Sequence, residues 1–164
     1  MKKVVTFIFL LFFSCNNINQ ECNTYYLIRH AEKVRIDPDN KDPELNEAGK
    51  QRAIVWQEYF TDLEIDKVYS TNYKRTMQTA LPVSNSKGLE ISLYSPSNID
   101  YEGFLYSTIG DNVLIVGHSN TIPTFVNEII NDNVYPDIED SNNSSLYIVS
   151  KCGDEINHEV IKID

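Results

Sequence analysis

Two histidines in this sequence directly follow short apolar runs. The stretch "YYLIRHAEK" (25–33) places Arg29 and His30 after four residues suited to a buried strand, and "VLIVGH" (113–118) places His118 after another such run. A neutral imidazole can act as a nucleophile, and a planar guanidinium can bind two oxygens of a phosphoryl group. These residue types at strand ends therefore indicate chemistry on a phosphorylated substrate.

Two further cations occupy an unfavourable place for positive charge. "STNYKRTMQTA" (70–80) puts Lys74 and Arg75 in the first turn of a predicted helix, where the helix dipole disfavours cations. An anion bound nearby would relieve that conflict. The stretch "SNTIPTF" (119–125), directly after His118, also begins a predicted helix with free backbone amides. Together these features predict a phosphate pocket.

The elements that must position these residues alternate along the chain. Short runs rich in β-branched and aromatic residues predict strands at 24–29, 67–70, 89–94, 112–117, 145–150 and 158–163. Helices are predicted at 46–60, with Asn46 as N-cap, and at 73–83, 99–109 and 120–130. This order predicts a three-layer α/β/α sandwich around a mostly parallel sheet of about six strands. The last two strands are too close for a crossover helix, so at least one is expected to be an antiparallel edge strand.

Such a sheet explains why distant residues would meet. In open α/β sheets, ligands bind at the carboxyl ends of the strands. Arg29, His30 and His118 all follow predicted strands and should therefore share one edge of the sheet.

Four motifs in order resemble the histidine phosphatase superfamily, the phosphoglycerate mutase-like fold of branch 1. They are "RHAEK", "LNEAGKQRA", "VYSTNYKRTMQTA" and "VLIVGHSNTIP". The resemblance covers nearly all of residues 24–130. It implies a phosphatase in which His30 attacks phosphorus and becomes a phosphohistidine, while Arg29, Arg75 and His118 bind the phosphoryl group. The chemistry requires no metal and no other cofactor, and the substrate would be a phosphomonoester or a phosphoramidate.

A general acid is harder to assign. Branch 1 phosphatases commonly supply one after the third strand, and here "YSPSNIDYEGF" (94–104) offers Asp100 and Glu102 without a motif around either. Glu102 is the candidate of the two, but the simpler interpretation of both is an acid on a helix surface. A catalytically weak or inactive phosphate-binding module of the same fold is therefore the alternative function.

The overall charge limits the partners. The chain has 14 Lys+Arg against 24 Asp+Glu and a formal net charge of −10. Nucleic-acid binding needs a basic face, so we expect no nucleic-acid partner. The expected partner is a phosphorylated small molecule or a phosphorylated surface group, and the protein is expected to be a monomer.

The first residues resemble an export signal. "MKKVVTFIFLLFFSCNN" has two lysines, an apolar run and a small residue before Cys15, and the run is too short for a permanent membrane span. We predict a lipoprotein-type signal peptide at 1–14, a tether at 15–23 with a lipid on Cys15, and one phosphatase domain at 24–164. The protein would then be exported and anchored to a bacterial membrane, facing the periplasm. An ordinary signal peptide with an incidental cysteine is the alternative.

The remaining polar residues leave alternatives open. Cys22 and Cys152 could form a disulfide in an exported protein or could remain unpaired thiols. Glu32 and Lys33 belong to the first motif, and a salt bridge at the rim of the site is their simplest role. His158 lies in the last predicted strand without a motif, so we expect it to be structural or exposed.

Overall fold

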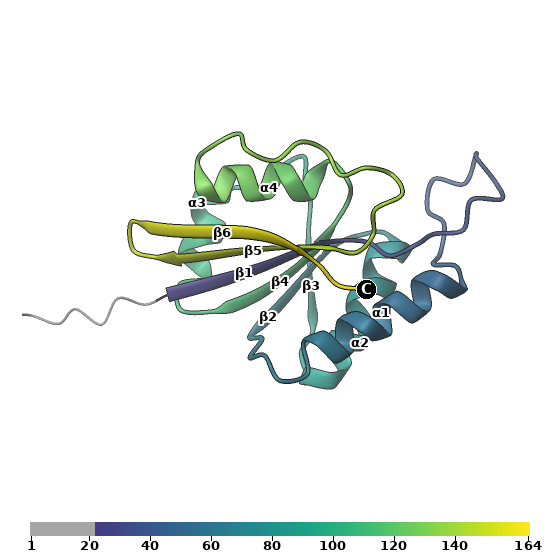
Figure 1. Ribbon diagram of the computed structural model, residues 1–164, viewed down its shortest axis with the longest axis horizontal. Coiled ribbons are helices and arrows are strands. Elements are labelled where there is room, and N and C mark those ends of the chain that lie inside the picture. The colour runs from purple at the N-terminus through teal and green to yellow at the C-terminus, as the bar shows by residue number, and fades with distance from the viewer. Residues whose placement is uncertain (1–21) are drawn as a thin grey trace, which may run out of the picture.

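A computed structural model describes residues 22–164 as six strands and four helices (Figure 1). In chain order these are β1 (Cys22–Arg29), α1 (Glu47–Tyr59), β2 (Lys67–Thr71), α2 (Lys74–Lys87), β3 (Ile91–Tyr94), α3 (Tyr101–Ser107), β4 (Asn112–Gly117), α4 (Thr121–Ile130), β5 (Ser145–Cys152) and β6 (Glu155–Lys162). Every predicted strand and helix of the described chain is present. No helix within these residues is long and apolar enough to cross a bilayer.

The six strands form one sheet in the order β3-β2-β4-β1-β5-β6. The four strands β3, β2, β4 and β1 are parallel, whereas β5 runs antiparallel to β1, and β6 to β5. Helices α1 and α2 cover one face of the sheet and α3 and α4 cover the other (Figure 1). The predicted three-layer sandwich with an antiparallel edge is confirmed, and its antiparallel part comprises two strands.

Alternating side chains of the central strands feed two separate cores. Tyr25 and Leu27 of β1 pack with α4 residues such as Phe125, whereas Ile28 packs with Trp56 of α1. All five side chains are almost completely buried. Because successive residues of a strand point to opposite faces, a strand covered on both faces must be apolar throughout. This explains the uninterrupted run that precedes Arg29.

Element ends differ from the prediction in a few places. β1 begins at Cys22, so the last two residues of the predicted 15–23 tether belong to the sheet. Helix α2 was predicted to end at 83 but continues past Pro82 to Lys87. It ends where Gly88 takes a left-handed conformation with φ 67°, which glycine adopts at little cost.

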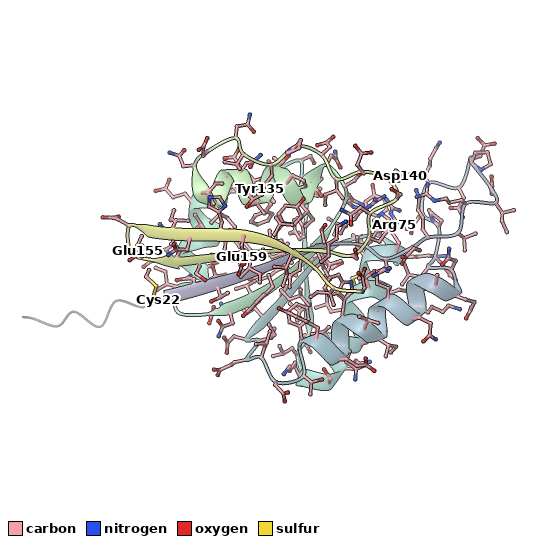
Figure 2. The ribbon with its side chains drawn as sticks, viewed as in Figure 1. Cys22, Arg75, Tyr135, Asp140, Glu155 and Glu159 are labelled. Carbon is pink, nitrogen blue, oxygen red and sulfur yellow. A yellow bond between two sulfur atoms is a disulfide. The ribbon has the colours of Figure 1, made fainter. Side chains whose placement is uncertain are left out.

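Of the two alternatives for Cys22 and Cys152, the structure shows the disulfide. Cys22 and Cys152 are directly opposite each other in the β1–β5 ladder, with their Cα atoms 4.3 Å apart, and their sulfurs are bonded. Figure 2 shows Cys22 where the described chain begins. The bond ties the first strand to the hairpin of the last two strands.

Candidate functional site

Two parallel strands end side by side and bring the histidines together. β1 and β4 are neighbours in which Arg29 is paired with Gly117, and the amide of His30 donates to the Gly117 carbonyl at 2.9 Å. The next residue of β4 is His118, whose ring centroid lies 5.5 Å from that of His30. The predicted meeting of the two motifs at one sheet edge is therefore what the structure shows.

The close approach at the end of β4 requires a glycine. A Cβ at Gly117 would lie 2.7 Å from Tyr94 Oη and 2.9 Å from Thr121 Oγ1. Thr121 instead accepts a hydrogen bond from the His118 amide at 2.9 Å. Strand β4 and helix α4 thus join in a tight turn that fixes the His118 backbone.

The contacts of His30 identify its free nitrogen. The side chain is 4% exposed, and Nδ1 lies 2.8 Å from the Ala31 carbonyl, which can only accept. Nδ1 therefore carries the proton and Nε2 keeps its lone pair. Burial lowers the pKa of His30 to about 3, opposed by the Ala31 carbonyl and assisted by the positive charge of Arg29 and the neighbouring His118. The imidazole is neutral at neutral pH, as a nucleophile must be.

His118 is oriented from both sides of its ring. Nδ1 lies 3.4 Å from Arg75 Nη2, and Nε2 lies 2.9 Å from Thr71 Oγ1. A guanidinium can only donate, so Nδ1 accepts and Nε2 donates to Thr71. Burial and then the positive charges of Arg75 and Arg29 lower the pKa of His118 to about 4. A phosphoryl dianion beside this ring would favour its charged form, which donates a hydrogen bond from Nδ1.

Arg29 is anchored by the chain between α4 and β5. Its Nη1 donates to the carbonyls of Glu139, Asp140 and Asn142 at 2.9, 3.0 and 3.1 Å. Its Nη2 donates to Asp140 Oδ1 at 2.7 Å. The side chain is 4% exposed, yet its Nε has no hydrogen-bond partner within residues 22–164. No sequence pattern marks these anchors, because three of them are backbone carbonyls.

Arg75 comes from the first turn of α2, as predicted, and stacks over an aromatic ring. Its guanidinium carbon lies 4.4 Å from the centroid of Tyr73, and Nη1 donates to the Lys41 carbonyl at 3.4 Å. Burial lowers the pKa of Arg75, and Asp42, 3.8 Å from Nη1, opposes that effect. Like Arg29, Arg75 has a buried Nε without a partner in the described part of the chain.

These two unpartnered N–H groups point to a ligand. Four buried side-chain polar atoms lack a partner among the described residues, and two of them are the Nε atoms of Arg29 and Arg75. Leaving a buried donor unsatisfied costs about 1–3 kcal/mol, and more for a charged group. An oxyanion that reached both guanidiniums would satisfy these donors.

The second motif (45–53) contacts the residues that follow β1. The side chain of Asn46 caps α1 by accepting from the Gly49 amide at 2.9 Å, as predicted. The backbone amide of Asn46 donates to the Glu32 carbonyl. A Cβ at Gly49 would collide with that carbonyl. Glu32 pairs with Arg52 at 2.8 Å, so it forms the expected salt bridge, whereas Lys33 does not.

Two positioning residues escaped the sequence analysis. Asn143, 7% exposed, donates from Nδ2 to the His30 carbonyl at 2.8 Å, and Thr79 Oγ1 accepts from the Ala31 amide at 2.9 Å. Both hold the backbone that presents the imidazole. Asn143 lies in a polar stretch predicted only as a loop, and nothing in its neighbours distinguishes it.

Other candidate residues lie apart from this cluster. Asp100 caps α3 by accepting from the Gly103 amide at 3.0 Å, and Glu102 is exposed in the same turn. Lys74 is exposed and pairs with Glu44 at 3.3 Å. Cys15 lies outside the described residues. Within the described chain, no group of three or more His, Cys, Asp or Glu side chains could hold a metal ion.

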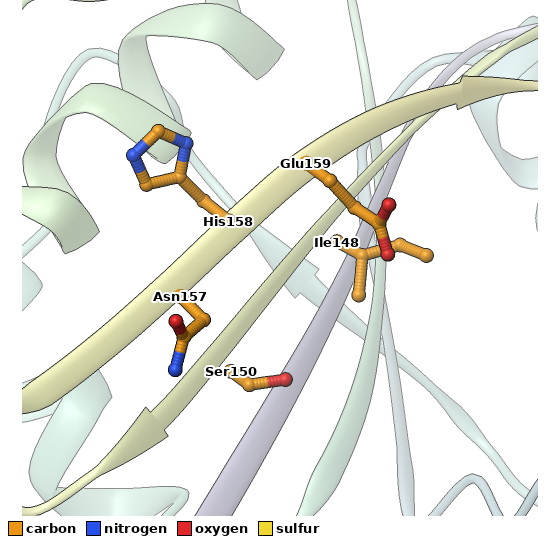
Figure 3. Close-up of a pocket in the computed structure, with 5 residues that line it drawn as sticks. All are labelled: Ile148, Ser150, Asn157, His158 and Glu159. Atoms are coloured by element: carbon orange, nitrogen blue, oxygen red, sulfur yellow. The ribbon is translucent and has the colours of Figure 1, made fainter.

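A separate hollow lies on the β5–β6 hairpin (Figure 3). It is lined by Ile148, Ser150, Asn157, His158 and Glu159, and includes none of the predicted site residues. His158 is exposed, as expected, and its Nδ1 lies 2.7 Å from Tyr135 Oη.

Fold and site together define an α/β/α protein that gathers two histidines and two arginines at the carboxyl edge of its sheet. A sequence model of the histidine phosphatase superfamily (branch 1) matches residues 25–95. The matched segment contains the first three of the four motifs, so this match agrees with the family that the motifs predicted. It is 36% identical over 70 residues to phosphoserine phosphatase 1 of Hydrogenobacter thermophilus, an alignment that spans 40% of this chain but only 33% of that relative.

Solved structures share the fold at low sequence identity. The protein histidine phosphatase SixA complexed with tungstate matches with a TM-score of 0.70 and 14% identity, over 85% of this chain and 96% of that one. A phosphoglycerate mutase from Bacillus anthracis matches with a TM-score of 0.66 and 15% identity, over 87% and 94% of the two chains. These likenesses confirm the phosphoglycerate mutase-like architecture.

Proposed function

We propose that this protein is a phosphatase that hydrolyses a phosphomonoester or phosphoramidate through a phosphohistidine on His30. The observation that supports this most is the neutral, buried His30, whose free Nε2 belongs to the same cluster as two guanidiniums with unsatisfied N–H groups. Nucleophile and oxyanion donors thus come from one preorganised cluster.

In the first step, His30 Nε2 attacks phosphorus, so that a P–N bond forms as the bond to the leaving atom breaks. Arg29 and Arg75 offset the charge on the phosphoryl oxygens, and His118 donates to them from Nδ1. In the second step, water attacks phosphorus and the P–N bond breaks. The electrons of the P–N bond return to Nε2, which restores the neutral imidazole. Inorganic phosphate leaves, and the water proton passes to solvent.

Neither predicted acid is assigned to leaving-group protonation. Asp100 is occupied as a helix cap and Glu102 is exposed on α3. An alkoxide leaving group would then take its proton from solvent. The nitrogen of a phosphoramidate can be protonated before it leaves and needs no general acid, so we expect phosphoramidates to be the faster substrates.

Trapping the intermediate tests the proposal. Brief incubation with a ³²P-labelled substrate should leave acid-labile, base-stable phosphate on the wild-type protein and none on His30→Ala. His158→Ala is the matched control, because it removes an exposed histidine far along the sheet, and it should retain the label. Label on a serine or aspartate would refute the assignment. Oxyanion binding without any label would identify the inactive binding module instead.

We also propose that the protein is exported and lipid-anchored through Cys15. Two features support this: the signal-like sequence of residues 1–15, and the Cys22–Cys152 disulfide, since such bonds persist mainly in oxidising compartments.

A further inference from the structure

Positive charge near the site exceeds what one phosphoryl group requires. Lys33 ends the first motif and Arg35 lies two residues further on, in a chain whose net charge is −10. Lys33 is partly buried, yet within residues 22–164 its ammonium group makes no ion pair and no hydrogen bond. Burial, and then the charges of Arg75 and Arg35, lower the pKa of Lys33, and the charge of Asp140 opposes this effect. A partly buried cation among other cations is costly unless an anion joins it.

The protein already places a carboxylate between Arg29 and Arg35. Asp140 accepts from Arg29 Nη2 at 2.7 Å and from Arg35 Nη2 at 3.1 Å through the same oxygen, and its other oxygen lies 2.9 Å from Arg35 Nη1. Asp140 is 71% exposed, whereas Arg29 is 4% exposed. Figure 2 labels Asp140 and Arg75 at the same end of the molecule. The space between Arg29 and Arg35 therefore fits a carboxylate, and the group that occupies it can swing into solvent.

We propose that Lys33 and Arg35 form a second anion-binding position beside the phosphoryl site, and that the substrate carries a carboxylate close to its phosphoryl group. Asp140 holds this position in the free protein and yields it to the substrate. Lys33, which lacks a partner of its own, then gains one. This inference rests on the proposed function for its reaction, but its binding claim can be tested without turnover.

Two inert phosphonates isolate the carboxylate. 2-Amino-3-phosphonopropionate and 2-aminoethylphosphonate differ only in that group, and calorimetry on the purified full-length protein in detergent gives both dissociation constants. We expect the carboxylated compound to bind about tenfold more tightly, which corresponds to about 1.4 kcal/mol, because its carboxylate adds hydrogen bonds to charged groups.

Variants assign the preference to residues. Lys33→Gln should remove most of it and leave the affinity for 2-aminoethylphosphonate within about twofold. Lys151→Gln is the matched control, because Lys151 lies at the opposite end of β5 and its ammonium group donates to the Gly153 carbonyl. Asp140→Asn should widen the preference, because it weakens the internal competitor. An equal loss for both phosphonates in Lys33→Gln would place Lys33 at the phosphoryl site and overturn the proposal.

Measurements of turnover distinguish this inference from the proposed function. O-Phosphoserine and phosphoethanolamine form the corresponding substrate pair, and kcat/KM should favour O-phosphoserine in wild type but not in Lys33→Gln. Equal affinities of wild type for the two phosphonates would overturn the second anion position even if both esters are hydrolysed. Selective phosphonate binding with no phosphate released from any substrate would support that position and reject the phosphatase.

Discussion

Replacing Arg75 with lysine tests whether the guanidinium shape, rather than charge, makes the oxyanion site. In the free protein this side chain bonds to the Lys41 carbonyl and His118, stacks on Tyr73, and keeps its buried Nε unpartnered. Lysine keeps the positive charge but offers a compact ammonium group in place of a planar guanidinium with several N–H donors. We therefore expect the fold to persist and oxyanion affinity to fall.

The size of the loss follows from the contacts. The variant loses at least the one donor that is free for the ligand, Arg75 Nε, and a hydrogen bond to a charged group contributes about 1.5–3 kcal/mol. Tungstate should then bind about ten- to a hundredfold more weakly. At a ligand concentration a hundred times the wild-type dissociation constant, stabilisation by mass action is about 2.7 kcal/mol for wild type and about 1.4 kcal/mol or less for the variant.

Thermal unfolding titrated with tungstate measures this difference. Arg52→Lys is the matched control, because Arg52 is also partly buried but pairs with Glu32 on the α1 side. It should respond to tungstate like wild type, after any change in its own stability is subtracted. If Arg75→Lys and wild type respond equally, the anion binds elsewhere and our interpretation of the two unpartnered arginines is wrong.

Three further predictions concern titration, the disulfide and the anchor. Because the folded state lowers the pKa of His30 to about 3 and of His118 to about 4, the unfolded chain binds more protons below pH 6.5. The free energy of unfolding should therefore fall as pH drops from 6.5 towards 4, by about 1.4 kcal/mol per pH unit for each histidine. Urea unfolding measured at several pH values should show that this free energy depends less steeply on pH in His30→Gln than in wild type. Replacing Cys22 and Cys152 with serine should cost about 2–4 kcal/mol in urea unfolding and leave kcat/KM unchanged; an unaltered unfolding midpoint would contradict the bond. Cys15→Ser should release the protein from the membrane fraction or leave it unprocessed, whereas mature-sized protein that remains membrane-bound would exclude a lipid on that residue.

The sequence was informative where one physical constraint acts on many neighbours. Strands β1 and β4 are buried on both faces, so their apolar runs were visible, and parallel pairing forces their ends to one edge. The proximity of His30 and His118 could therefore be predicted from the sequence alone. Arg75 could be placed with them because a cation in the first turn of α2 conflicts with the helix dipole.

Boundaries were predicted less well, because they depend on single contacts. The helix predicted at 73–83 continues past Pro82 to Lys87, where a left-handed Gly88 terminates it at little cost. The start of β1 at Cys22 depends on its partner across the sheet, Cys152, which lies 130 residues away in sequence.

The chain between α4 and β5 shows why the charge balance of the site could not be predicted. It contributes three carbonyls to Arg29, an amide to the His30 backbone through Asn143, and the carboxylate of Asp140. Carbonyl groups are the same in every residue, so no pattern of side chains marks a loop that supplies them. An exposed aspartate in a polar stretch likewise resembles any solvated one. Asp140 becomes informative only because Arg29 and Arg35 share it, and that shared carboxylate predicts a second negative charge on the substrate.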